Sequence, residues 1–357
     1  MRTSIALLTR LGLIIGIVFG LLALSVSLVA AQSTTVQITG ASPIQVIADV
    51  PLVAGKATVL KLTLTASAKV SGRVNVTFGG RNKSESATLA RGTSTLYVKV
   101  DPPAAPGTIT FSAQFVPSGG TASKVFQGQA QVLQLQRDRM KVFFLPVDWT
   151  AADRAKSMPG KFNSFVTSSG DFFRGTYPFP ENNITIGSTQ TPYMLSPDER
   201  AIVDASGNFN WGNITALYSS LVLAGRRQQP DADLVVGVLP PKWYARVLND
   251  PAVVGLELNV VKAAVSSQVD SDYATLAHEA GHIFGRFDDY DFGRKPPLIG
   301  TRIDAPGYWV AKGRPITPAD KQAFYSFMGA SDARSQYWVD RDTYLSILEM
   351  LQSGAAP

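Results

Sequence analysis

Both histidines of this 357-residue chain lie in one pentapeptide, His278-Glu279-Ala280-Gly281-His282, and this feature constrains the fold most. On an α-helix, residues four apart lie on one face, one turn from each other, so both imidazoles can bind the same metal ion. The glutamate between them can act on a water molecule that the metal holds. A solvated helix face with two unrelated histidines is the alternative. The pattern favours a zinc site with His278 and His282 as ligands and Glu279 as general base.

The flanking residues predict where this helix begins and ends. Apolar side chains recur with helical spacing from Tyr273 to Phe284, and Asp270-Ser271-Asp272 supplies N-cap candidates just before them. Gly285 follows immediately and can take the left-handed conformation that ends many helices. We therefore expect a helix over residues 273–284, with the two histidines near its C-terminal end.

A catalytic zinc usually has three protein ligands, and the chain offers no third histidine and no cysteine. Asp288 lies three residues beyond Gly285, where a chain that reverses at the glycine returns to the metal. Its neighbour Asp289 is the alternative at the same turn, and Glu349 is the only glutamate further downstream. Asp288, Asp289 and Asp291 also admit a structural Ca²⁺ site, because calcium takes oxygen ligands.

The segment HEAGHIFGRFDD, residues 278–289, resembles the metzincin pattern HExxHxxGxxH with aspartate in the last position, as in snapalysin-like metzincins. The stretch Phe287-Asp288-Asp289-Tyr290 is also similar to the segment after HExGH in the IgA-peptidase family. The resemblance implies a Zn²⁺ site with one catalytic base and three ligands: Glu279 as base, and His278, His282 and Asp288 as ligands. Asp289 then supports the turn, whereas the IgA-peptidase-like register exchanges the two aspartates.

A methionine turn beneath the zinc is a second mark of metzincins, and Phe327-Met328-Gly329 resembles it. The resemblance implies that Met328 forms the base of the pocket, although a methionine alone is more often core packing. Some metzincins carry a tyrosine two residues after the methionine, where this chain has Ala330. Candidates for steadying a developing oxyanion are Tyr290, Tyr325 and Tyr337.

The N-terminus is typical of an exported protein. Arg2 and Arg10 precede an uncharged, mostly apolar run from Leu11 to Val29, and Ala31 suits cleavage by signal peptidase. The run is also long enough to span a bilayer as an uncleaved anchor. In both cases residues 1–31 are a targeting segment, and we expect the rest of the chain to be secreted or otherwise extracytoplasmic.

Residues 32–136 are predicted to form an all-β accessory domain. Alternating apolar and polar runs cover 58–64, 71–78, 94–100 and 107–115, with glycine- and proline-rich turns between them. Short strands at this spacing predict a β-sandwich. The texture resembles the immunoglobulin-like accessory modules of exported bacterial proteins, so we expect contact with a cell surface, a glycan or the substrate.

Residues 137–357 are predicted to form a second domain that folds without the first. Buried strands are expected over 141–147, 232–239 and 258–265, and helices over 151–168 and 214–224. Strands that alternate with helices indicate a mixed α/β or α+β domain. Together with the histidine motif, this predicts an α+β zincin catalytic domain.

These features predict an exported zinc-dependent endopeptidase that acts on a protein or peptide substrate. Two alternatives stay open: a surface adhesin or binding protein whose zinc site is structural or vestigial, and a zinc amidase that acts on a cell-wall component. The net charge of +6 is spread along the chain without a basic run interleaved with aromatics. Nucleic acid is therefore not an expected partner.

Overall fold

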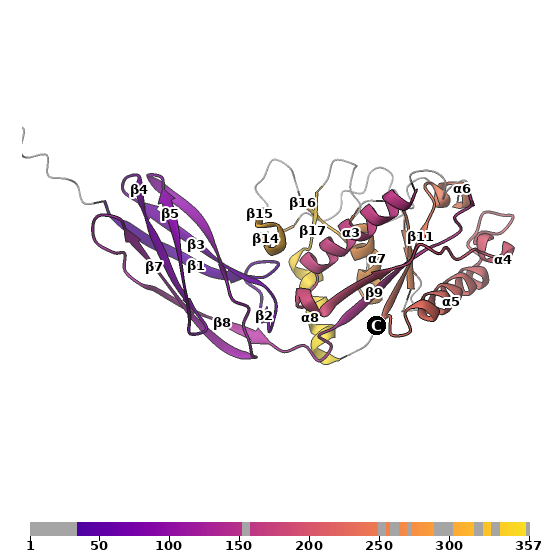
Figure 1. Ribbon diagram of the computed structural model, residues 1–357, viewed down its shortest axis with the longest axis horizontal. Helices are drawn as coiled ribbons and strands as arrows, with labels where there is room; N and C mark the ends of the chain where they lie inside the picture. Colours follow the sequence, from indigo (N-terminus) through magenta and orange to yellow (C-terminus); the bar gives the residue numbers. More distant parts are fainter. Residues whose placement is uncertain are drawn as a thin grey trace, which may run out of the picture.

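The chain forms two parts that lie side by side, a β-sandwich and a helix-covered sheet (Figure 1). The computed structural model describes residues 34–151, 158–248, 255–257, 264–269, 271, 273–288, 303–317, 324–329 and 336–354. The predicted targeting segment, residues 1–31, lies outside these ranges. Within them, no helix has the length and apolar character needed to cross a membrane.

The first part is a sandwich of two sheets, which confirms the all-β prediction. The sheets have the orders β1-β3-β6 and β2-β8-β7-β4-β5. Along β4, buried Val74, Val76 and Phe78 alternate with more exposed residues, and the inward side chains of both sheets form one apolar core. The strands are β1 (Val36–Ile44), β2 (Leu52–Val53), β3 (Thr58–Ala66), β4 (Val70–Phe78), β5 (Arg81–Leu89), β6 (Gly92–Val100), β7 (Gly107–Pro117) and β8 (Phe126–Leu133).

The strands β5 and β1 were not predicted from the sequence pattern, for different reasons. β5 lies at the edge of its sheet and is mostly exposed, so it needs few apolar residues. β1 pairs with β3 through a register shift between Ile38 and Gly40, which interrupts its alternation of apolar and polar residues.

The second part is built on a five-stranded sheet of order β10-β9-β11-β13-β12. Four strands are parallel, and the edge strand β12 runs antiparallel to β13. Val142 and Phe144 of β9 enter one apolar core, while Phe143 and Leu145 enter the core on the opposite face. The strands are β9 (Met140–Pro146), β10 (Ile184–Ser188), β11 (Leu234–Leu239), β12 (Gly255–Glu257) and β13 (Ala264–Gln268).

Helices cover both faces of this sheet. One core contains side chains of α3 (Met158–Thr176), α7 (Thr275–Ile283) and α8 (Arg341–Ser353), and the other contains those of α5 (Trp211–Gln228) and α6 (Trp243–Leu248). The smaller elements are η2 (Glu181–Asn183), α4 (Pro197–Arg200), β14 (Gly307–Trp309), η3 (Val310–Lys312), β15 (Arg314–Ile316), β16 (Phe324–Ser326) and β17 (Gln336–Trp338).

Some predicted boundaries need correction. The helix expected over 151–168 is α3, which continues to Thr176, and the helix expected over 214–224 is α5, which is longer at both ends. The strand expected over 258–265 is β13, which runs on to Gln268, while residues 258–263 lie outside the described ranges. Its end was missed because Ser266, Ser267 and Gln268 are polar yet buried.

The two parts share an interface that residue composition did not reveal. β8 ends at Leu133 and β9 begins at Met140, on either side of the expected boundary. The crossing segment, residues 45–56, lies between β1 and β3 and contains β2. Its Val46 and Ile47 are nevertheless 0% and 1% exposed, within the core of the second part. This shared core weakens the expectation that residues 137–357 fold alone.

Candidate metal centre

The histidine motif lies on α7, which begins at Thr275, two residues later than predicted. Its N-cap is Ala274 and makes no side-chain cap bond, whereas Ser271 donates to the carbonyl of Gln268 at 2.7 Å. Asp270 and Asp272 lie outside the described residues. The predicted stop at glycine is confirmed, because Gly285 has φ +76° directly after the last turn. Both histidines therefore sit in the last two turns of the helix.

The chain reverses at Gly285 and returns to the histidines. The N–H groups of Gly285 and Arg286 donate to the carbonyls of His282 and Gly281, at 2.8 and 3.0 Å. These bonds satisfy carbonyls at the helix end and turn the chain back across it. The turn delivers Asp288 to the face that carries the two imidazoles.

Three ligand atoms converge at this face. Asp288 Oδ1 lies 3.2 Å from Nε2 of His278 and 3.4 Å from Nε2 of His282. The two Nε2 atoms are 3.2 Å apart. Asp288 Oδ1 is buried, and none of its contacts has the angles of a hydrogen bond. Among the described residues these three side chains form the group of histidines and carboxylates that can hold a metal ion.

The other ring nitrogen of each histidine is already engaged. His278 Nδ1 lies 2.8 Å from the carbonyl oxygen of Phe327, and His282 Nδ1 lies 2.9 Å from that of Arg286. A carbonyl only accepts, so each Nδ1 carries the proton and donates. Each Nε2 then presents its lone pair toward Asp288. This arrangement of backbone partners behind two imidazoles is typical of metal-binding histidines.

Without a metal, the three groups shift one another's pKa. Burial lowers the pKa of both imidazoles, but contacts with Asp288 and Glu279 outweigh it. The pKa of His278 therefore rises, and that of His282 rises to about 9. Burial raises the pKa of the Asp288 carboxyl, but the two imidazoles outweigh this and hold the pKa well below its usual range. Without a metal, both imidazoles therefore hold a second proton more readily than a free histidine does.

The predicted methionine turn lies directly against the motif helix. Met328 is fully buried, and a Cβ built at Gly281 would lie 2.3 Å from its Sδ. The turn is closed by a bond from Gly329 N to the carbonyl of Ser326 at 3.0 Å. The same turn presents the Phe327 carbonyl to His278. Met328 therefore packs beneath the helix at the glycine between the two histidines.

A buried aspartate braces this turn from below. One Asp340 oxygen accepts the hydroxyl of Ser326, and the other accepts the N–H of Thr343 at 2.8 Å and so caps α8. The Ser326 hydroxyl oxygen in turn accepts the N–H of Met328 at 3.2 Å. The start of α8 and the methionine turn are therefore held by one carboxylate.

Glu279 lies next to the converging ligands on the same helix. It is 6% exposed, and its charge raises the pKa of both imidazoles. Burial raises the pKa of Tyr218 and Tyr244, whose hydroxyls bond to Ser266 on β13, and the Glu279 charge adds to that rise. The carboxylate is therefore close enough to act electrostatically on the imidazole pair and on these two hydroxyls.

Other predicted site residues are not part of this group. Glu349 is exposed on α8 and does not join the two histidines, so the alternative of Glu349 as third ligand finds no support. Tyr325 and Tyr337 face each other across β16 and β17, the strand pair beside the methionine turn. The remaining candidates lie outside the described residues: Asp289, Tyr290, Asp291 and Ala330.

Sequence reasoning missed the groups that orient the ligands. Two of them are backbone carbonyls, of Phe327 and Arg286, which leave no signature in a sequence. A third is Tyr177, whose buried hydroxyl donates to the carbonyl of Ala277 on α7 at 2.7 Å. Ser326 and Asp340 carried a weak signal, since an aspartate before an apolar helical pattern is a cap candidate.

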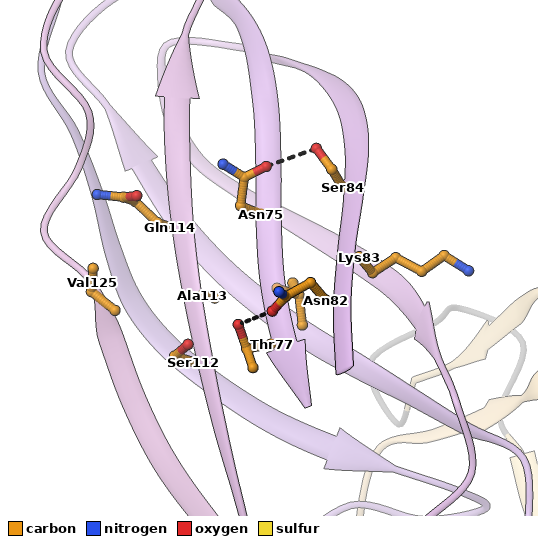
Figure 2. A pocket seen from close by; sticks show the side chains of 10 residues that line it. Asn75, Thr77, Asn82, Lys83, Ser84, Ser112, Ala113, Gln114 and Val125 are labelled. Atoms are coloured by element: carbon orange, nitrogen blue, oxygen red, sulfur yellow. Dashed lines mark hydrogen bonds between the residues drawn. The ribbon is translucent and has the colours of Figure 1, made fainter. Parts of the chain in front are cut away.

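A concave surface lies on the β-sandwich, away from the histidines. This groove has a volume of about 400 Å³ across β4, β5 and β7. Figure 2 shows the side chains that line it, which are mainly amides and hydroxyls. Several of these bond to one another: Thr77 donates to Asn82 and Ser84 donates to Asn75, both at 2.7 Å. No histidine or carboxylate lines the groove, so it offers polar contacts but no acid–base chemistry.

Comparisons with known proteins identify no family. No family model matches the chain, and no curated protein matches it. Among solved structures, a CARDB domain of a Pyrococcus furiosus protein in complex with di-metal ions is 14% identical and covers 28% of this chain and 87% of its own, with a TM-score of 0.21. Fibronectin(III)-like modules of Clostridium thermocellum CbhA are 22% identical, cover 28% of this chain and 98% of their own, and score 0.19.

A putative β-galactosidase from Bacteroides fragilis is also similar over a longer stretch. It is 12% identical with a TM-score of 0.23, and the match covers 57% of this chain but only 40% of that protein. None of these three is named as a peptidase. Scores this low assign neither a fold family nor a function.

Proposed function

We propose that this chain is an exported zinc-dependent endopeptidase whose catalytic domain, residues 137–357, is a zincin of the metzincin type. The convergence of His278 Nε2, His282 Nε2 and Asp288 Oδ1 on one point carries the proposal. Two imidazoles with one carboxylate suit zinc, whereas calcium prefers oxygen ligands alone. The methionine packed beneath the helix and the glutamate between the histidines support the same reading.

The chain's own residues supply the remaining chemistry. Zinc, when bound, would act as a Lewis acid that lowers the pKa of water and polarises the scissile carbonyl. Glu279 takes a proton from the attacking water and passes it to the leaving amine. The Phe327 and Arg286 carbonyls accept from Nδ1–H and so keep both neutral imidazoles in the tautomer whose Nε2 has a lone pair for the metal.

The sheet offers one edge beside this site for a peptide. β12 is the end strand of the sheet, runs antiparallel to β13, and packs against α7. A substrate in extended conformation would add to this edge, with its scissile bond near the histidines. The Tyr218 hydroxyl bonds to the carbonyl of Leu256 and fastens the strand from behind.

The proposal also covers location and the role of the sandwich. Export follows from the N-terminal segment, as a cleaved signal or an uncleaved anchor. The groove of Figure 2 would suit a polar ligand such as a cell-surface glycan, because amides and hydroxyls line it.

The test compares the mature chain, residues 32–357, with its Glu279→Gln variant on unfolded protein substrates, with and without a chelator. We expect zinc-dependent cleavage by the wild type, and a loss of about 10²–10⁴-fold in the variant with zinc retained. Glu349→Gln is the matched control, since Glu349 is exposed on α8.

The same assay separates the alternatives. Release of amide-linked fragments from cell wall, without peptide cleavage, would identify the amidase. Zinc binding with no hydrolysis of either substrate would favour an adhesin with a structural site. Near wild-type cleavage by Glu279→Gln would refute the proposed role of the glutamate.

A further inference from the structure

We propose that Trp338 is a positioning residue for His278, through which the crossing segment of the β-sandwich helps to build the metal centre. This inference rests on the proposed zinc site. It also implies that the sandwich is a permanent part of the enzyme, because its removal would dismantle a metal ligand's support.

The path runs through three hydrogen bonds. The Trp338 indole Nε1–H donates to the carbonyl of Val46 at 3.1 Å, and both groups are buried. The Trp338 carbonyl accepts the N–H of Phe327 at 2.8 Å. The Phe327 carbonyl then accepts Nδ1–H of His278 at 2.8 Å. Each bond orients the next, so a shift of Trp338 would move the Phe327 carbonyl, which fixes the orientation of the His278 imidazole.

The sandwich holds its end of this path firmly. The Val46 carbonyl also accepts the N–H of Tyr308 at 3.1 Å, and Ala48 N donates to the carbonyl of Pro306 at 2.7 Å. Gly307 lies between these contacts, where a Cβ would be 2.5 Å from both Trp338 Nε1 and the Val46 carbonyl oxygen. The close approach of the two parts therefore requires a glycine there.

A buried lysine fastens the other end of the crossing segment. Lys56 is 0% exposed and donates to the carbonyl of Phe179 at 2.8 Å and to Glu181 at 3.1 Å. The other Glu181 oxygen accepts the N–H of Ala57 at 3.0 Å. With both ends anchored, the segment is a fixed support rather than a flexible linker.

The experiment uses full-length mature protein and two readouts. Trp338→Phe removes the indole donor and keeps an aromatic ring, and β-(3-benzothienyl)alanine at position 338 keeps the shape of tryptophan without the N–H. Zinc affinity is measured by competition with a chelator, and we expect it to fall about tenfold, as when an orienting partner of a ligand is lost. The second readout is the nuclear magnetic resonance signal of each histidine Nδ1–H in metal-free protein.

The chain has two histidines, so isotope-labelled histidine gives two side chains to assign. We expect the His278 signal to shift and exchange faster, while the His282 signal stays, because its Nδ1 bonds within its own turn. Trp309→Phe is the control, since Trp309 packs beside Trp338 but its indole N–H has no partner among the described residues.

The outcomes separate this inference from the proposed function. A wild type that binds no zinc would overturn the proposed function and leave the histidine signals to test the path. The path alone would be overturned by a different result: the wild type binds zinc, and both replacements at position 338 leave the zinc affinity and the His278 signal unchanged. Equal effects from Trp309→Phe would show that packing, not the hydrogen bond, is responsible.

Discussion

Gly281 packs against Met328, and a Cβ at position 281 would lie 2.3 Å from the methionine Sδ. The glycine stands between the two histidines on α7, and the methionine stands in the turn whose carbonyl orients His278. A side chain at position 281 would therefore force the Met328 side chain or the turn to shift.

This contact predicts the effect of Gly281→Ala. The added methyl should force the turn away from the helix, with a destabilisation of about 1–3 kcal/mol typical of overpacking and a loss of zinc affinity. Thermal unfolding and chelator competition measure both. Gly160→Ala on α3 is the control, since a Cβ there meets nothing within 4 Å, and alanine favours a helix. Equal stability of the two variants would contradict the contact.

The ligand assignment predicts an order among three variants. His278→Ala should abolish stoichiometric zinc binding, and Asp288→Ala should weaken it strongly because Oδ1 lies at the convergence point. Asp289→Ala should weaken it less, as for a residue that supports the turn. Chelator competition on the purified variants checks the order. A stronger effect from Asp289 would support the IgA-peptidase-like register instead.

The raised pKa of His282 predicts that zinc binding releases protons. With a pKa of about 9 in the metal-free protein, this imidazole is protonated at neutral pH, so zinc must displace about one proton there. Calorimetric titration in buffers of different ionisation enthalpy counts the released protons. The number should fall as pH approaches 9 and zinc affinity should rise over the same range; a count near zero at neutral pH would contradict the shift.

The same shift has a consequence for the stability of the metal-free protein. A folded-state pKa above the unfolded value of about 6.5 stabilises the fold at low pH. That stabilisation is complete below about 6.5 and is lost as pH rises through about 9. The unfolding temperature of metal-free protein should fall as the pH rises across this range, and the His282→Ala variant should not show this fall.

The anchored crossing segment predicts a large effect of Lys56→Ala. The change leaves the carbonyl of Phe179 without its buried donor and the partly exposed Glu181 carboxylate without its cation, at a cost of about 1–3 kcal/mol. Unfolding by denaturant measures the cost, with Lys99→Ala on the exposed side of β6 as control. We also expect the two parts of wild-type protein to unfold in one transition. Separate transitions would indicate that the interface is weak.

Local chemistry made much of the site predictable from the sequence. Helical spacing places residues 278 and 282 one turn apart, and Gly285 supplies the positive φ that ends the helix and returns Asp288. These relations depend on residues within about three turns of each other, where backbone geometry is the same in any fold. The alternating strands of the sandwich were predictable for the same reason, while the polar edge strand β5 was not.

The sequence by itself determined the types and spacing of the candidate metal ligands, and the β-rich character of residues 32–136. Only the tertiary structure decided what holds them. The bond from His278 to the Phe327 carbonyl spans 49 residues, and the bond from Trp338 to the Val46 carbonyl spans 292. Such partners are chosen by how packed segments meet, and a backbone carbonyl is the same at every position. For that reason the sequence could place the histidines on a helix but could not show that the sandwich supports one of them.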